Sequence, residues 1–316
     1  TMRRTCFCTW LASSVVRATG ILKKWYAEQI LELGAVWNVQ TYWYDWRRPL
    51  DEIADDLRRR IDGWFGADSE VNLVAHSMGG LVSRTYIARH PGRWRRGGRL
   101  IMLGTPNHGS FAIPQVITGA IDTVRRLALV DLKHDLDAIT KILGNLPGCL
   151  EMLPSPLVMP GMAPLYQAGT WGLKVSQSLL DQARRHHDVL AEVVDPERMS
   201  YVAGCNRRTH DDIRDWSRLG SLEGYSASMN GDGTVPHRLG FLEKDGVRIP
   251  TWFVQEDHGA LPNHEGVIAA TLALLAGEEC TLSRTPEGAR GVAADRAAAR
   301  GLARSERERR AEEDAR

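Results

Sequence analysis

Residues 73–80, Leu-Val-Ala-His-Ser-Met-Gly-Gly, decide the fold of this chain. The apolar run Val71–Ala75 stops at Ser77, which small residues flank, and a helical pattern of apolar residues from Leu81 to Ile87 follows at once. A strand, a sharp turn and a helix with serine at the turn are typical of a nucleophile elbow, whose strained backbone presents the hydroxyl above a sheet. The alternative is an ordinary strand-to-helix turn with an incidental serine. The stretch therefore predicts an α/β protein with Ser77 as a candidate nucleophile.

The small residues around Ser77 fit the close approach of strand and helix that an elbow requires. Ala75 and Gly79 stand two positions before and after the serine, which makes the motif an A-x-S-x-G variant of G-x-S-x-G. The residue after such a serine donates its backbone N–H to the oxyanion of an acyl-transfer intermediate. We therefore expect Met78 to supply one oxyanion donor.

A catalytic serine needs a base and an orienting acid, and in this architecture they follow in the order Ser, Asp or Glu, His. Asp232 lies in Asn230–Pro236 with a glycine on each side, which permits a tight loop that aims one carboxylate inward. A surface turn is the alternative, because Asp-Gly is a common turn dipeptide. His258 follows the short apolar strand predicted at 249–254, so it is the candidate base.

His264 competes with His258 for the role of base. It follows Asn263, which we predict to cap a helix running from Val267 to Leu275, and a histidine in a first helical turn is more often a solvated surface group. His76 adjoins Ser77, but neighbouring side chains on an elbow point apart. We expect His76 and six further histidines to be structural or exposed: His108, His134, His186, His187, His210 and His237.

The chain resembles the lecithin:cholesterol acyltransferase-like branch of the α/β-hydrolases, which includes phospholipases and bacterial lipase-like members. The resemblance covers roughly residues 20 to 277 and is carried by six blocks in the family's order: Tyr44–Arg47, Ala75–Gly80, Leu103–Ser110, Leu150–Ser155, Gly231–Pro236, and His258 followed by His264. It implies an α/β-hydrolase fold, a mostly parallel sheet with helices on both faces. It also implies Ser77 as nucleophile, Asp232 as acid and His258 as base. Asp45 and Trp46 would lie near the site, or serve as ion-pair and core residues instead.

One departure from the family concerns the amino-terminal end. The family begins with a strand and a Pro-Gly or His-Gly loop that supplies a second oxyanion donor, and residues 1–18 show no such loop. We therefore expect the first strand to be missing, as in a truncated gene product, with the N–H of Met78 as the one identifiable donor. Loss of one donor typically costs roughly 10²–10³ in turnover. The 316-residue chain is accordingly expected to be poorly soluble or weakly active.

The apolar pattern divides the chain into a body, an insertion and a tail. Residues 1–110 and 198–280 read as the α/β-hydrolase core, with strands predicted at 36–44, 71–75, 99–103, 199–204 and 249–254. Residues 111–197 break the alternation with helical patterns at 121–129, 132–143 and 175–194, and are read as a helical cap. Residues 281–316 contain many Arg, Glu and Ala and no aromatic residue, which predicts a disordered or frayed tail.

Composition limits partners and location. The 316 residues are 43% hydrophobic and 25% charged with a net charge of +1, which gives no reason to expect a nucleic-acid partner. No apolar run reaches the length of a transmembrane helix, and the five cysteines lack metal-ligand spacing, so we predict neither metal nor cofactor. Arg3 and Arg4 precede a mildly apolar stretch, but Trp10 and the serines after it dilute a signal-peptide reading. A cytoplasmic location is favoured slightly over a secreted one.

The sequence predicts a serine esterase or lipase, or an acyltransferase, that acts on a carboxylic ester through an acyl-enzyme. A lipid ester, met at a membrane or lipid-particle surface, is implied by the resemblance. Apolar residues between 146 and 162 could form an acyl-binding wall or pack the cap on the body. Two alternatives stay open: a catalytically impaired fragment or lipid-binding pseudo-enzyme without the oxyanion strand, and a serine amidase or thioesterase.

Overall fold

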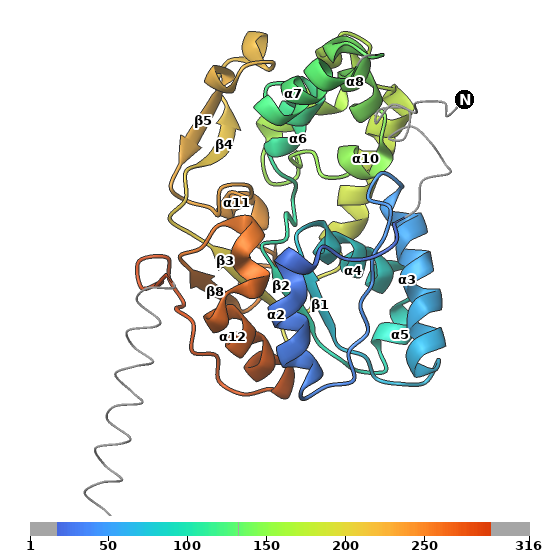
Figure 1. The fold of residues 1–316 in the computed structure, drawn as a ribbon, viewed down its shortest axis with the longest axis vertical. Helices are drawn as coiled ribbons and strands as arrows, with labels where there is room; N and C mark the ends of the chain where they lie inside the picture. Colours follow the sequence, from blue (N-terminus) through green and yellow to red (C-terminus); the bar gives the residue numbers. More distant parts are fainter. Residues whose placement is uncertain (1–17, 132, 292–316) are drawn as a thin grey trace, which may run out of the picture.

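A four-stranded parallel sheet forms the centre of the molecule (Figure 1). The computed structural model describes residues 18–131 and 133–291. Strands lie in the order β1-β2-β3-β8, with each pair parallel. Their bounds are Leu73–His76 for β1, Leu100–Leu103 for β2, Met199–Gly204 for β3 and Thr251–Val254 for β8. Because the strands are parallel, all their carboxyl ends meet at one edge, where ligands bind in open α/β sheets.

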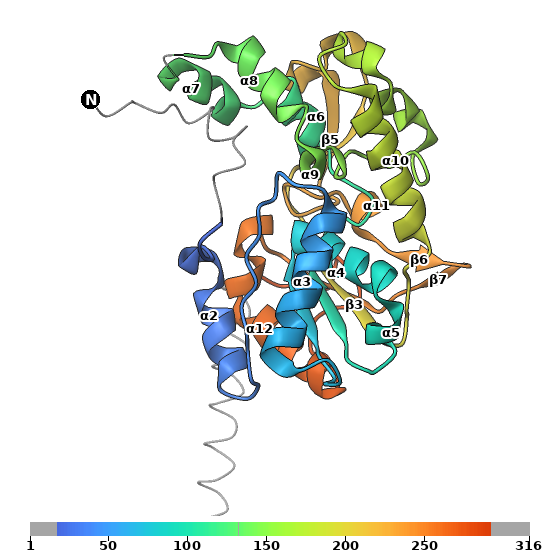
Figure 2. The ribbon, with the colours of Figure 1, turned by 90° about the vertical axis from the view of Figure 1, so that its right-hand side faces the viewer.

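Helices cover both faces of the sheet, as the sequence predicts. In β2, Leu100 and Met102 face one hydrophobic cluster, while Ile101 and Leu103 face another, because successive side chains of a strand point to opposite faces. Figure 2 shows the two helical layers on either side of the strands. The first cluster lies under α3 (Leu50–Phe65), α4 (Met78–Arg89) and the short α5 (Pro91–Trp94), and the second under α2 (Lys23–Gly34) and α12 (Glu265–Ala276).

The strand predicted at 36–44 is wrong. This segment has no regular secondary structure, and β1 is an outer strand of the sheet among the described residues. Its aromatic residues still pack inward: Tyr42 and Tyr44 contact the first cluster, and the Tyr42 hydroxyl donates to the Ile53 carbonyl at 2.9 Å. The apolar pattern therefore reports the burial of side chains, whereas a strand also needs a backbone partner.

The segment between β2 and β3 forms a helical cap above the carboxyl edge of the sheet (Figure 1). The predicted helices are present as α7, α8 and α10: α7 is shifted by one residue, and α8 and α10 are shorter than predicted. Bounds of the cap elements are α6 Ala112–Ile117, α7 Asp122–Val130, α8 Leu136–Leu143, α9 Pro147–Leu150, α10 Gln177–Ala191, and the 3-10 turns Pro160–Tyr166 and Ala168–Trp171. An antiparallel hairpin of β4 (Thr209–Ile213) and β5 (Tyr225–Ser228) adds Ile213 and Tyr225 to the cap's hydrophobic core. The cap's core thus extends beyond residues 111–197.

Two buried ionisable side chains, Arg84 and Glu151, join the cap to the body. Arg84 on α4 is fully buried and donates to the Leu190 carbonyl near the end of α10. Burial lowers the pKa of Arg84 to about 9. Glu151, directly after α9, accepts from the backbone N–H of Leu50 at 2.7 Å and from Gln182 Nε2 at 3.1 Å. Because Leu50 begins α3, Glu151 caps a body helix from the cap.

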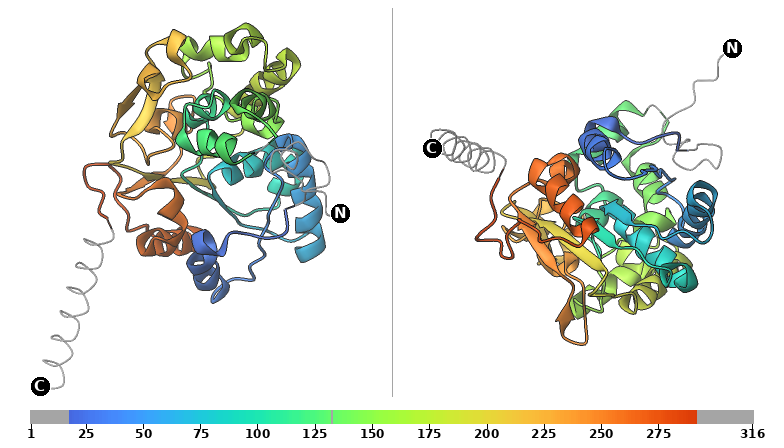
Figure 3. Two further views of the ribbon diagram at one scale, coloured as in Figure 1. Left: turned by 45° about the horizontal axis from the view of Figure 1, so that its top comes forward. Right: turned by 90° about the horizontal axis from the view of Figure 1, so that it is seen from below.

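The last described residues return along the outer strand β8. Backbone N–H groups of Phe253 and Gln255 donate to the carbonyls of Ser283 (2.8 Å) and Arg290 (3.0 Å). The disordered or frayed tail predicted for 281–316 is therefore wrong for residues 283–290. These residues are held in place because the outer strand β8 has N–H groups that need acceptors. Residues 292–316 lie outside the described residues, as do residues 1–17, on which the expectation of a missing oxyanion loop rests. Seen from below, this return segment runs beside the sheet's outer strand (Figure 3).

Candidate active site

Ser77 lies in a strained turn between β1 and α4. Its backbone adopts φ 54° and ψ −130°, a positive φ that few residues other than glycine accept. The Ser77 N–H donates to the Leu103 carbonyl at 2.9 Å, which continues the β1–β2 ladder by one residue. Met78 begins α4, so its N–H is one of the first-turn amides that find no acceptor within a helix. This is the geometry of a nucleophile elbow.

The closest packing at the elbow falls on Gly80, not on Gly79. A Cβ atom added at Gly80 would lie 2.0 Å from Thr105 Oγ1, whereas one at Gly79 would lie 3.7 Å from the Ala75 Cβ, an ordinary contact. The sequence motif predicts the steric constraint at Ala75 and Gly79. Helix α4 instead meets the loop after β2 most tightly, at a fully buried Thr105.

Asp232 lies in a loop whose hydrogen bonds fix its carboxylate. Oδ1 accepts from the backbone N–H groups of Thr234 (2.9 Å) and Val235 (2.7 Å). The N–H of Gly233, which has φ 92°, donates to Thr209 Oγ1 at 2.8 Å. Because Asp232 is only 2% exposed and Oδ1 is already bonded, Oδ2 remains for an external partner.

His258 joins Asp232 to Ser77. It begins the 3-10 turn His258–Asn263, which a three-residue loop joins to the end of β8. Its ring Nδ1 lies 2.7 Å from Asp232 Oδ2, and its Nε2 lies 2.9 Å from Ser77 Oγ. A carboxylate only accepts, so Nδ1 carries the proton and a neutral ring leaves Nε2 as the acceptor for the serine hydroxyl. The His258 N–H also donates to the Asp232 carbonyl at 2.8 Å. The structure thus brings the three predicted side chains into one hydrogen-bonded line.

Gly104 borders the aspartate–histidine pair, a role that sequence reasoning did not assign. It has φ 55°, and a Cβ there would lie 3.0 Å from both Asp232 Oδ2 and His258 Nδ1. The available signal was its position directly after β2, at the carboxyl edge of the sheet. Ser110 in the same loop donates to the Thr234 carbonyl at 2.5 Å, which ties this loop to the acid loop.

His264, the competing candidate for the base, and the two residues expected near the site, Asp45 and Trp46, all lie outside the hydrogen-bonded line. His264 is 3% exposed, and its Nδ1 accepts from the Gly266 N–H at 3.1 Å. It is therefore the cap of α12 in place of Asn263, and the expected solvated position is wrong because capping draws the ring inward. Asp45 forms an ion pair with Arg47, and Trp46 is 42% exposed.

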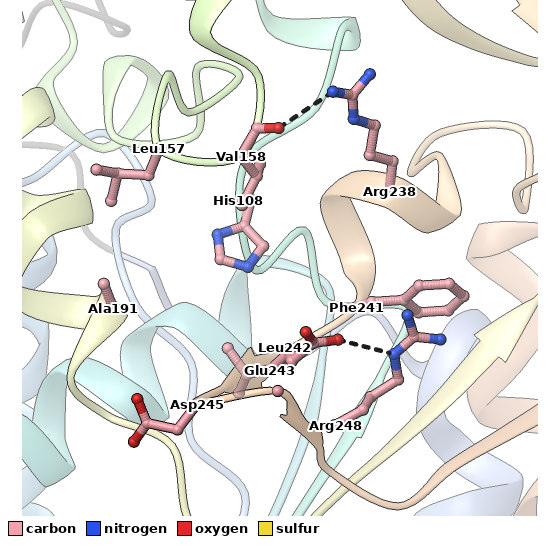
Figure 4. Close-up of a pocket in the computed structure, with 11 residues that line it drawn as sticks. His108, Leu157, Val158, Ala191, Arg238, Phe241, Leu242, Glu243, Asp245 and Arg248 are labelled. Carbon is pink, nitrogen blue, oxygen red and sulfur yellow. Dashed lines mark hydrogen bonds and ion pairs between the residues drawn. The ribbon is translucent and has the colours of Figure 1, made fainter.

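The apolar residues at 146–162 mainly form the cap's own core. Leu146, Leu150, Leu153, Met159 and Met162 are all buried in it. Leu157 is half exposed and borders a cavity of about 400 Å³ under the end of α10 (Figure 4). Among the described residues, those that line this cavity do not include Ser77, Asp232 or His258.

Three charged side chains that line this cavity, Arg238, Arg248 and Glu243, each have a partner among the other lining residues. Figure 4 shows the His108 ring directed into it, the Arg238 guanidinium bonded to the Val158 carbonyl (3.2 Å), and Arg248 paired with Glu243 (3.7 Å). Burial lowers the pKa of His108 to about 3, so its ring is neutral at ordinary pH. In residues 18–131 and 133–291, no cluster of His, Cys, Asp or Glu could hold a metal ion. Over the same ranges, no helix is both long and apolar enough to cross a membrane.

A parallel sheet between two helical layers, with a serine elbow at its carboxyl edge, defines the α/β-hydrolase class. The chain belongs to the lecithin:cholesterol acyltransferase family: the family model matches residues 8–173, more than half of the chain. The predicted family and fold are therefore confirmed. Membership assigns the chain to the lipid ester hydrolases and acyltransferases.

Similar solved structures include the Tle4-Tli4 complex, with 16% identity, coverage of 84% of this chain and 72% of that chain, and a TM-score of 0.50. Phospholipase PlaB from Legionella pneumophila has 12% identity, coverage of 84% and 58%, and a TM-score of 0.47. The mature Bacillus licheniformis lipase BlEst2 has 16% identity, coverage of 72% and 75%, and a TM-score of 0.31. At these identities the likeness concerns the fold alone. No curated protein matches the chain in sequence.

Proposed function

We propose that this chain hydrolyses or transfers the acyl group of a carboxylic lipid ester through an acyl-enzyme on Ser77. The observation that carries the proposal is the single imidazole of His258, within 2.9 Å of Ser77 Oγ on one side and 2.7 Å of Asp232 Oδ2 on the other. A base in contact with both nucleophile and orienting acid is the arrangement that activates serine in unrelated hydrolases.

The first half of the reaction forms the acyl-enzyme. Ser77 Oγ attacks the ester carbonyl while His258 Nε2 takes the hydroxyl proton. Asp232 stabilises the imidazolium that results and keeps the proton on Nδ1. The Met78 N–H donates to the oxyanion of the tetrahedral intermediate. When this intermediate collapses, the ester C–O bond breaks and His258 returns the proton to the leaving alcohol.

The second half releases the acyl group. A nucleophilic oxygen attacks the acyl-enzyme carbonyl while His258 accepts its proton. When this second intermediate collapses, the bond between the acyl carbon and Ser77 Oγ breaks, and the same proton returns to Oγ. Water as nucleophile gives a carboxylic acid, and an alcohol gives a new ester. The cap above the carboxyl edge of the sheet supports control of water access at this step.

A fluorophosphonate probe tests the proposal directly, because it labels only an activated serine. We expect Ser77 to be labelled and Ser77→Ala to lose p-nitrophenyl ester turnover by roughly 10⁴-fold or more. His258→Ala should lose nearly as much, because these residues act as a unit. His264→Ala is the matched control: it removes a helix cap worth about 1 kcal/mol and should keep most of the turnover.

Three results would contradict the proposal. An unlabelled wild-type chain that binds lipid vesicles would indicate a lipid-binding pseudo-enzyme. An inactive His264→Ala beside an active His258→Ala would overturn the choice of base. Faster turnover of matched amides or thioesters than of oxygen esters would replace the substrate class. Phospholipid vesicles with and without an added alcohol then separate hydrolysis from transfer through the products formed.

A further inference from the structure

His76, the residue before Ser77, makes two hydrogen bonds that lead away from the serine. Its ring Nε2 lies 2.9 Å from the backbone carbonyl oxygen of His258, and its Nδ1 lies 3.0 Å from the Tyr26 hydroxyl. The His76 and His258 rings also contact each other, with centroids 4.8 Å apart. Adjacent residues of the elbow therefore contact the proposed base at two places, Ser77 at the ring and His76 at the backbone.

The direction of each hydrogen bond follows from the chemistry of its partners. A carbonyl oxygen only accepts, so His76 Nε2 carries a proton and donates to His258. Burial, and then the nearby His258 ring, lowers the pKa of His76 to about 4, so the ring is neutral at ordinary pH. A neutral ring that is protonated at Nε2 accepts at Nδ1, and the Tyr26 hydroxyl therefore donates to it.

These contacts complete the fixation of His258. Its N–H donates to the Asp232 carbonyl, its Nδ1 to the Asp232 carboxylate, and its Nε2 faces the serine. The backbone carbonyl of His258 is the remaining polar group, and it accepts a hydrogen bond from His76 Nε2. Without this donor the 3-10 turn that begins at His258 would keep the acid-side contacts but lose its bond to β1.

Helix α2 supports the same turn from outside the proposed triad. Tyr26 belongs to this helix, and the Lys24 carbonyl accepts from Asn263 Nδ2 at 2.9 Å. The neighbouring Trp25 ring lies against Gly259, where an added Cβ would come within 3.1 Å of it. The two ends of the turn are thus both tied to one turn of α2.

We propose that Tyr26 and His76 form a positioning relay that fixes the His258 carbonyl and thereby the distance from its ring to Ser77. The inference rests on the proposed function, because it assigns His258 as the base. Neither residue is a catalytic residue here, since each acts through the backbone of His258. A displacement of about 1 Å in a catalytic group can cost about 10² in rate, so the relay should affect kcat more than KM.

The test compares three substitutions in ester turnover. His76→Leu removes the donor to His258, and we expect kcat to fall by about 10²-fold with little change in KM. His76→Gln places an amide N–H near the position of Nε2 and should recover at least about tenfold of that loss, which a purely structural role would not predict. Tyr26→Phe removes one hydroxyl and should lower kcat about fivefold, the equivalent of one hydrogen bond.

Tyr42→Phe is the matched control. Its hydroxyl is likewise hydrogen-bonded, to the Ile53 carbonyl at 2.9 Å and to Asp56 Oδ2 at 3.2 Å, both on α3 and away from His76 and His258. It should lose comparable thermal stability to Tyr26→Phe but keep the wild-type kcat. Equal kcat values for Tyr26→Phe and Tyr42→Phe would overturn the relay.

Nitrogen-15 NMR of histidine-labelled wild-type chain gives a readout that needs no turnover. We expect His76 in the Nε2–H tautomer in the wild type, and a shift of the tautomer equilibrium in Tyr26→Phe. An Nδ1–H tautomer in the wild type overturns the relay, even where His76→Leu does not fold. If the fluorophosphonate leaves the wild type unlabelled, the proposed function fails. If it labels the wild type while His76→Leu retains kcat within about twofold, only the relay fails.

Discussion

Ser77 and Asp232 reach His258 from turns that are fixed by different physical means. The Ser77 turn is fixed by lack of space: its φ is 54°, and a Cβ added three residues later at Gly80 would lie 2.0 Å from Thr105 Oγ1. The Asp232 turn is fixed by hydrogen bonds, two from its own backbone to Oδ1 and one from Gly233 to Thr209. A Cβ at Gly233 would come no closer than 4.0 Å to a neighbouring side chain, although one at Gly231 would lie 2.6 Å from Thr209 Oγ1.

The difference teaches which substitutions each turn tolerates. A turn that depends on shape fails when an atom is added, whatever its polarity. A turn that depends on polar partners fails when a donor or acceptor is lost, whatever the volume. The elbow should therefore be sensitive to a methyl group at Gly80. The acid loop has its own close contact at Gly231, and it should in addition be sensitive to isosteric changes of hydrogen bonding.

The largest effect should come from the isosteric change Asp232→Asn. Oδ1 can still accept from Thr234 and Val235, so the loop should keep its conformation. The amide N–H₂ would then face His258 Nδ1 and force the proton onto Nε2, where the ring cannot accept from Ser77. We expect kcat for an ester to fall by about 10⁴-fold with an unchanged melting temperature.

Asp257→Asn provides the control for this change, because Asp257 is a neighbouring, exposed carboxylate that pairs with Arg207. It should leave kcat near the wild-type value. A variant Asp232→Asn with more than a tenth of the wild-type kcat would show that the carboxylate does not set the tautomer of His258.

The second-largest effect should be a difference in stability between alanine substitutions at the two elbow glycines, Gly80 and Gly79. Gly80→Ala should destabilise the fold by about 3 kcal/mol, because the methyl group overlaps a fully buried Thr105. Gly79→Ala should change stability by no more than about 1 kcal/mol, the difference in helix propensity. Urea unfolding measures both. A double-mutant cycle with Thr105→Gly should recover part of the Gly80→Ala loss, and equal losses for the two alanines would remove the steric explanation.

The smallest effect should come from Thr209→Val, which exchanges the hydroxyl for a methyl group of similar size. The Gly233 N–H would lose its acceptor, at a cost of about 1 kcal/mol. Turnover should fall far less than in Asp232→Asn, because Asp232 keeps its own two N–H donors. Chemical unfolding and ester assays of both variants check this. A turnover loss as large as that of Asp232→Asn would show that the loop depends on Thr209 alone.

Local patterns predicted the elements that carry the site. Ser77, Asp232 and His258 each follow a strand or a glycine turn that short sequence motifs report, and their mutual contacts follow from the parallel sheet. Their chemical roles stay a prediction. The strand expected at 36–44 failed because alternating aromatic residues indicate burial, whereas a ladder needs a neighbouring backbone.

Contacts between distant segments were not predictable in the same way. Tyr26 bonds to His76 across 50 residues, and the hairpin at 209–228 packs into the cap's core. A lone tyrosine in a helical pattern carries no sign of its partner. The motif does not predict the constraint at Gly80, because Thr105, which packs against it, lies 25 residues further along the chain and reaches it only after folding.

The buried carboxyl group of Glu151, which extends from the cap to the start of α3, makes folding a proton-binding reaction. Burial raises the pKa of Glu151 from 4.5 to about 7, against the hydrogen bonds from Leu50 and Gln182. Between those two values the folded chain keeps a proton that the unfolded chain has released, so stability falls as pH rises through the window and levels off above pH 7. In Glu151→Gln this part of the slope should vanish, as urea unfolding across the window would record. The joint between cap and body thus takes up a proton when it forms, and acidification should tighten it.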